Sequence, residues 1–176
     1  MTSSATRDSM EQRPASWLPM AVVAMGQTLT TLNISALPVL IGAMVDEFGI
    51  APTMVASTIV VYSIAVSGFI MLGAKLGQKH GATTVFRWST ALLLLASALT
   101  TYSPNFGMLL AAQGLSGLGA ALLLPSLVVL ITDNYSGQQQ AKAIGLLGGV
   151  QAAATVVTIL IAGFVGTHLG WRYSFG

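Results

Sequence analysis

Residues 143–167 read AIGLLGGVQAAATVVTILIAGFVGT, a stretch without a single charged residue. Two further uncharged stretches lie between Phe48 and Ala74 and between Trp88 and Thr132. A helix needs about 20 predominantly apolar residues to cross a bilayer, because the hydrocarbon layer is about 30 Å thick. Each stretch is long enough, so the sequence predicts a protein that spans a membrane.

The overall composition agrees with lipid as the solvent. Hydrophobic residues make up 54% of the chain and charged residues only 7%, and the mean hydropathy is +0.78. A soluble domain of this composition would expose far too much apolar surface to water. Hydrocarbon offers no hydrogen-bond partners, so only helices or a closed barrel can span it, and barrel strands are only about 10 residues long. We therefore expect an all-α membrane protein.

The charges and the absence of cysteine argue against several kinds of site. The formal charge is only +2 and the cations are scattered, which is not typical of a nucleic-acid-binding surface. Without cysteine the chain has no disulfide, no thiol nucleophile and no cysteine-ligated metal. We expect no cofactor, no metal site and no nucleic-acid partner.

Hydropathy predicts five complete spans and the beginning of a sixth. Residues 1–16 are polar and mixed in charge, as is typical of a disordered tail. Residues 17–176 form the predicted transmembrane bundle, with a basic turn at residues 75–84 and a polar stretch at 133–142. The expected spans cover about residues 17–45, 53–74, 84–102, 106–132 and 143–167, and a sixth begins near residue 172. The sequence stops at that point, so we expect a fragment.

The distribution of cations predicts the orientation. Cytoplasmic loops of membrane proteins carry an excess of Lys and Arg. A cytoplasmic N-terminus leaves only Arg172 outside and places the remaining cations inside: Arg7, Arg13, Lys75, Lys79, Arg87 and Lys142. We expect a multi-pass protein of the cell membrane whose tail faces the cytoplasm.

Two motifs resemble those of the major facilitator superfamily. Residues 74–81, AKLGQKHG, resemble its signature loop G-x-L-x-D-R-x-G-R-K between spans 2 and 3. Residues 109–125, LLAAQGLSGLGAALLLP, resemble the span 4 motif of its fourteen-span drug:proton antiporter branch. Residues 33–38, 142–145 and Trp171-Arg172 also stand where that branch has similar residues.

The resemblance implies an N-terminal six-helix bundle that packs against a second, C-terminal bundle absent from this sequence. It implies a secondary transporter, not an enzyme, that exports small amphipathic solutes or drugs by alternating access. It also implies a cytoplasmic gating loop that acts as a latch between the two bundles: Ala74, Lys75, Leu76, Gly77, Gln78, Lys79 and Gly81. A simpler interpretation of its cations is that they only set the topology.

Three departures from the branch bear on proton-coupled antiport. Gln113 stands where the branch has an arginine implicated in proton coupling, and Leu29 falls where it often has an aspartate. Residues 158–163, TILIAG, replace the span 5 motif G-P-x-x-G-G. These differences argue against proton-coupled antiport by this chain.

Uncharged polar residues inside the predicted spans are candidates for the solute pathway: Gln27, Asn33, Tyr62, Gln113, Gln151 and Thr155. The alternative is that they form hydrogen bonds between helices, worth about 0.6 kcal/mol each in a membrane. Small residues would let helix backbones approach closely. For this packing role we single out Gly117, Thr158, Ala162 and Gly163.

Two other functional hypotheses remain. Residues 114–117, GLSG, resemble the serine motif of rhomboid-type intramembrane proteases, with Ser116 as nucleophile. A serine nucleophile needs a base, and the two histidines, His80 and His168, lie outside the predicted mid-membrane segments. The second alternative is an inactive half-transporter, because alternating access requires two bundles that enclose one site.

Overall fold

The computed structural model describes residues 17–168 and 170–175. Five long helices follow one another: α2 (Leu18–Phe48), α3 (Pro52–His80), α4 (Ala82–Thr101), α5 (Phe106–Asn134) and α6 (Gly137–His168). A short 3-10 helix, η1 (Trp171–Ser174), comes after α6. The described residues contain no strand, and all five long helices are long and apolar enough to cross a membrane. The prediction of an all-α membrane protein with five spans is confirmed.

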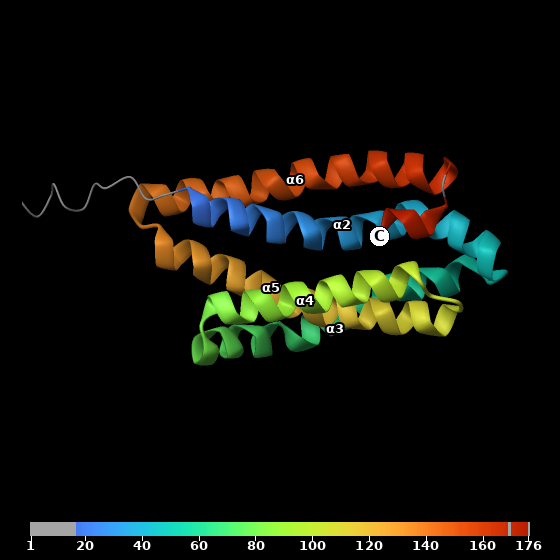
Figure 1. Cartoon of the computed structure of the whole chain (residues 1–176), viewed down its shortest axis with the longest axis horizontal. Coiled ribbons are helices and arrows are strands. Elements are labelled where there is room, and N and C mark those ends of the chain that lie inside the picture. The colour runs from blue at the N-terminus through green and yellow to red at the C-terminus, as the bar shows by residue number, and fades with distance from the viewer. Residues whose placement is uncertain (1–16, 169, 176) are drawn as a thin grey trace, which may run out of the picture.

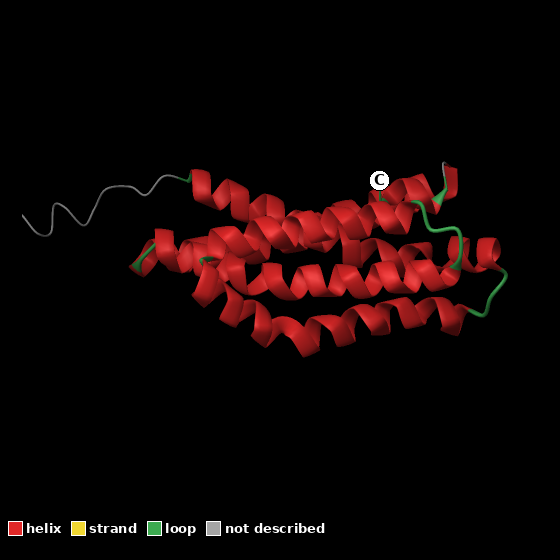
Figure 2. Cartoon of the chain, turned by 60° about the horizontal axis from the view of Figure 1, so that its bottom comes forward, coloured by secondary structure: helices red, strands yellow, loops and turns green. Residues whose placement is uncertain are grey.

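The helices run side by side along the long axis of the molecule. Figure 1 shows α6 lying along α2, while α3, α4 and α5 form a second group; Figure 2, a view from another side, shows the same elongated bundle. α5 packs against α2, α3 and α4, whereas α6 packs mainly on α2. As a result, α5 is the most buried of the five spans and α6 the least.

Two helices continue beyond their predicted apolar spans. The basic turn predicted at residues 75–84 is wrong: α3 continues to His80, α4 starts at Ala82, and Gly81 alone separates them. Gly81 has φ 83°, which glycine adopts without strain. α6 likewise starts at Gly137, inside the predicted polar stretch. Lys and Gln are good helix formers, so both helices continue beyond their apolar residues.

Glycines allow the backbones of α3 and α5 to come very close together. A Cβ atom added to Gly73 would lie 2.2 Å from the carbonyl oxygen of Ala121, and one added to Gly117 would lie 2.5 Å from that of Tyr62. Real Cβ atoms do not approach other atoms this closely. The α3–α5 crossing therefore requires glycine at both positions.

We expect Gly73→Ala to destabilise the bundle, because a backbone carbonyl cannot move aside as a flexible side chain can. Overpacking of this kind lowers the free energy of unfolding by about 1–3 kcal/mol. The matched control is Gly68→Ala on the same helix, where an added Cβ meets nothing within 4 Å. Thermal unfolding in detergent measures both variants. Equal midpoints for Gly73→Ala and Gly68→Ala would contradict the close contact.

Candidate functional site

Two polar contacts join α5 to its neighbours inside the bundle. The hydroxyl of Ser116 on α5 donates a hydrogen bond to Oδ1 of Asn33 on α2 at 3.3 Å. One turn earlier on α5, Nε2 of Gln113 donates to Oγ1 of Thr100 on α4, also at 3.3 Å. All four side chains are buried. The polar centre of the bundle therefore lies where α2, α4 and α5 meet.

Asn33 also lines a cavity between α2, α4 and η1. This cavity has a volume of about 390 Å³, and its polar wall includes Ser97, Thr101 and Ser174. Leu29 and Leu32 line both this cavity and a second, more apolar one of about 560 Å³ that extends along α2 and α4. Ligand pockets for small molecules have volumes of this order and mostly apolar walls. Both cavities are mostly apolar, and the one at Asn33 adds a few polar groups to its wall.

The other pathway candidates occupy different surroundings. Tyr62 is buried at the α3–α5 crossing, and the amide of Gln27 donates to Thr31 within α2 at 3.4 Å. On α6, Gln151 is exposed, and the half-buried Thr155 donates to its backbone carbonyl at 2.9 Å. The structure therefore brings Asn33 and Gln113 to the polar centre but does not bring Gln151 and Thr155 there.

Gln113 is fully buried, and only half of its amide is satisfied. Its Nε2 donates to Thr100, while its Oε1 has no hydrogen-bond partner among the described residues. An unpaired buried acceptor is unfavourable by about 1–3 kcal/mol. The Oε1 atom of Gln113 is thus a hydrogen-bond acceptor without a partner among the described residues, and it lies at the polar centre of the bundle.

The small residues proposed for packing lie on two different helix contacts. Gly117 is in the α3–α5 crossing described above. On α6, Thr158 and Ala162 are buried, and a Cβ on Gly163 would make an ordinary contact with Val39 of α2 at 3.8 Å. These α6 positions face α2, the helix on which α6 mainly packs.

The residues of the expected gating loop form the last turns of α3 and its junction with α4. Gly77 is buried, Ala74 and Leu76 are half-buried, and the exposed positions are Lys75, Gln78, Lys79 and Gly81. The segment is helical up to His80, so its polar side chains are presented on a rigid helix end.

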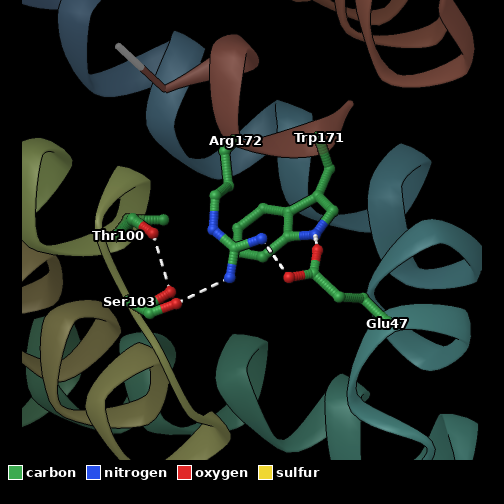
Figure 3. Close-up of polar contacts among 5 residues, drawn as sticks. All are labelled: Glu47, Thr100, Ser103, Trp171 and Arg172. Atoms are coloured by element: carbon green, nitrogen blue, oxygen red, sulfur yellow. Dashed lines mark hydrogen bonds and ion pairs between the residues drawn. The ribbon is translucent and has the colours of Figure 1, made fainter. Parts of the chain in front are cut away.

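At the opposite end of the bundle, a cluster that the sequence did not predict joins three segments (Figure 3). The carboxylate of Glu47, at the end of α2, accepts a hydrogen bond from the indole of Trp171 and pairs with the guanidinium of Arg172. Arg172 also donates to the carbonyl of Ser103 between α4 and α5 at 2.7 Å. We name these four residues the outer cluster, after the side of the membrane on which the sequence analysis expects them. The sequence held one indication of this cluster: Glu47 and Arg172 carry opposite charges and lie at the same predicted end of the bundle.

The structure does not support the serine-protease alternative. The hydroxyl of Ser116 donates its hydrogen bond to Oδ1 of Asn33. His80 contacts the ring of Trp88, and His168 stacks on Phe164, with ring centroids 5.6 and 4.5 Å apart. Neither histidine is placed to act as a base for Ser116. Within the described part of the chain, no group of three or more His, Asp or Glu residues could hold a metal ion.

Several known transporters and resistance proteins are similar to this chain. The puromycin resistance protein pur8 of Streptomyces alboniger is 27% identical over 161 residues, 91% of this chain and 32% of its own length. The riboflavin transporter RibZ of Clostridioides difficile is 22% identical over 90% of this chain and 35% of its own. The methylenomycin A resistance protein of Bacillus subtilis is 26% identical over 89% of this chain and 34% of its own length. This chain spans about a third of the length of these relatives.

The profile of the Major Facilitator Superfamily matches residues 23–176, which is most of the chain. The match includes the loop at residues 74–81 and the span 4 motif at 109–125, so the resemblance inferred from these motifs is confirmed. The chain therefore belongs to the major facilitator superfamily, whose members are membrane transporters and not enzymes.

Proposed function

We propose that this chain forms one helical bundle of a transporter that exports small amphipathic solutes or drugs across the cell membrane by alternating access. The observation that carries the proposal is the cavity at Asn33, because polar groups line it and an apolar cavity adjoins it. Resistance proteins for puromycin and methylenomycin A among the relatives support the class of solute. Two such walls suit a molecule with one polar and one apolar side.

A complete transport site requires a second bundle. In this fold, two bundles rock against each other around a site near the middle of the membrane. The relatives are about three times as long as this chain, which leaves room in them for such a bundle. We propose that the second bundle comes from a longer form of this chain or from another polypeptide. An isolated bundle would be an inactive half-transporter.

The bundle offers neutral groups, not charges, to a solute. Within the described helices, Asp, Glu, Lys and Arg occur only near the ends, and Asn33 and Gln113 at the polar centre are uncharged. An ionisable side chain in mid-membrane is unfavourable by about 2.5–3.5 kcal/mol and is kept where it serves transport. We propose that any proton coupling uses a carboxylate outside the described residues, or that transport is facilitated diffusion.

Replacing Asn33 tests the solute site. We expect Asn33→Leu to slow efflux of ethidium or puromycin about tenfold from cells that make the full-length protein, because an apolar side chain of similar size removes the amide from the cavity wall. A tenfold change corresponds to about 1.4 kcal/mol, within the range for one buried hydrogen bond. Ser63→Ala, on the exposed face of α3, is the control. Unchanged efflux by Asn33→Leu at equal membrane abundance would refute the site.

The orientation can be tested with single cysteines, because residues 1–176 contain none. We expect a membrane-impermeant maleimide, added to intact cells, to label Tyr102→Cys at the end of α4 and not Gln138→Cys at the start of α6. Both positions are exposed and lie at opposite ends of the bundle. Opening the cells should make Gln138→Cys reactive, which controls for its accessibility. Labelling of Gln138→Cys in intact cells would reverse the proposed topology.

The latch proposal predicts the effect of restoring the family's acidic residue. Gln78 is exposed on the last turn of α3 and keeps hydrogen-bonding capacity without charge. We expect Gln78→Asp to stabilise the state in which the cytoplasmic side is closed, by about 0.3–1 kcal/mol if the carboxylate faces a helix N-terminus of the second bundle. Cysteine accessibility on the two sides of the full-length protein reports these populations. Identical populations would count against a latch.

A further inference from the structure

A group of exposed basic side chains surrounds the junction of α3 and α4. Lys75, Lys79 and His80 lie on the last turns of α3, and Arg87 and Trp88 lie on the second turn of α4. We name these five residues the basic hairpin. Gly81 is the only residue between the two helices, so the cations of both helices lie at one end of the bundle (Figure 1).

The cations of the basic hairpin lack carboxylate partners within the described chain. The ion pair found among residues 17–168 and 170–175 is Arg172 with Glu47, in the outer cluster at the opposite end. At the end of the bundle that holds the basic hairpin, the described acidic residue is Asp133 at the end of α5, and it forms no ion pair there. Among the residues that the structure describes, the cations of the hairpin therefore have no carboxylate partner.

An aromatic ring adjoins these cations at the junction of α3 and α4. The side chain of Trp88 is 53% exposed, and its ring lies 5.6 Å from that of His80 between ring centroids. Tryptophan is enriched at membrane interfaces, where its ring lies at the level of the lipid headgroups. Trp88 is therefore placed beside a headgroup that the cations would attract.

We propose that the basic hairpin binds the phosphate headgroup of an anionic phospholipid in the adjacent leaflet. Lys75 and Lys79 are four residues apart on one helix and therefore lie on the same face. Arg87 lies on the other helix, α4, and its guanidinium can donate two parallel hydrogen bonds to phosphate oxygens. Trp88 contacts the lipid where headgroup and acyl chains meet. The binding does not depend on the proposed transport activity.

Lipid-dependent stabilisation of the purified protein tests this inference. The unfolding midpoint in detergent is measured against increasing phosphatidylglycerol, with phosphatidylcholine and soluble glycerol phosphate as separate arms. We expect phosphatidylglycerol alone to raise the midpoint. Lys79→Gln and Arg87→Gln should each raise the half-effective phosphatidylglycerol concentration about fivefold, the equivalent of about 1 kcal/mol per cation.

The matched control is Lys142→Gln, which removes one exposed cation from the same end of the bundle but from α6. We expect it to respond to phosphatidylglycerol as the unaltered protein does. An equal rise in the half-effective phosphatidylglycerol concentration for Lys79→Gln, Arg87→Gln and Lys142→Gln would show that general surface charge causes the effect. That result would overturn the site. A response to glycerol phosphate equal to that to the lipid would show a free-phosphate site instead.

A second measurement does not rely on unfolding. Brominated phosphatidylglycerol should quench tryptophan fluorescence more strongly than brominated phosphatidylcholine, because the anionic lipid is held next to Trp88. We expect this difference between the two lipids to disappear in Trp88→Phe, even though Trp17 is also exposed at that end. A difference that persists in Trp88→Phe would place the anionic lipid elsewhere.

Discussion

The contact between the backbones of α3 and α5 is the constraint on which the bundle depends. Lipid tails are as apolar as leucine, so burial of apolar side chains between helices yields no hydrophobic gain in a membrane. Van der Waals contact at short range must replace it, and Gly73 and Gly117 allow this contact by exposing backbone atoms of α3 and α5. Gly119 of α5 likewise makes room for α4, since a Cβ atom added there would lie 2.8 Å from the side chain of Leu93.

The position of α5 in turn organises the polar interior. Gly117 faces α3, and the polar residues Gln113 and Ser116 reach α4 and α2. Hydrogen bonds between membrane helices contribute only about 0.6 kcal/mol each, so these contacts orient the helices more than they stabilise them. Ser116 also holds Asn33, which lines the cavity, so the same residue takes part in helix packing and in the proposed solute contact.

Hydropathy was sufficient to predict the five spans. The predicted ends of α3 and α6 were wrong because residues outside the apolar stretches also favour helix. A window of apolar residues marks where the chain lies in hydrocarbon, whereas a helix ends only where its backbone turns, as at Gly81. Hydropathy describes a whole segment and does not show which of its positions contact a neighbouring helix; on α6, Thr158 is buried and Gln151 is exposed. Glu47 and Arg172 are 125 residues apart, and only tertiary packing pairs them.

The two ends of the bundle use their charges in opposite ways. In the outer cluster, Glu47 and Arg172 neutralise each other, and Trp171 and the Ser103 carbonyl take up the remaining hydrogen bonds. At the other end, Lys75, Lys79 and Arg87 stay exposed without ion pairs within the described chain. A paired charge holds helices of the same bundle together, while an unpaired one remains available to a headgroup or to a second bundle. The paired end is therefore suited to keeping this bundle rigid, and the unpaired end to contacts outside it.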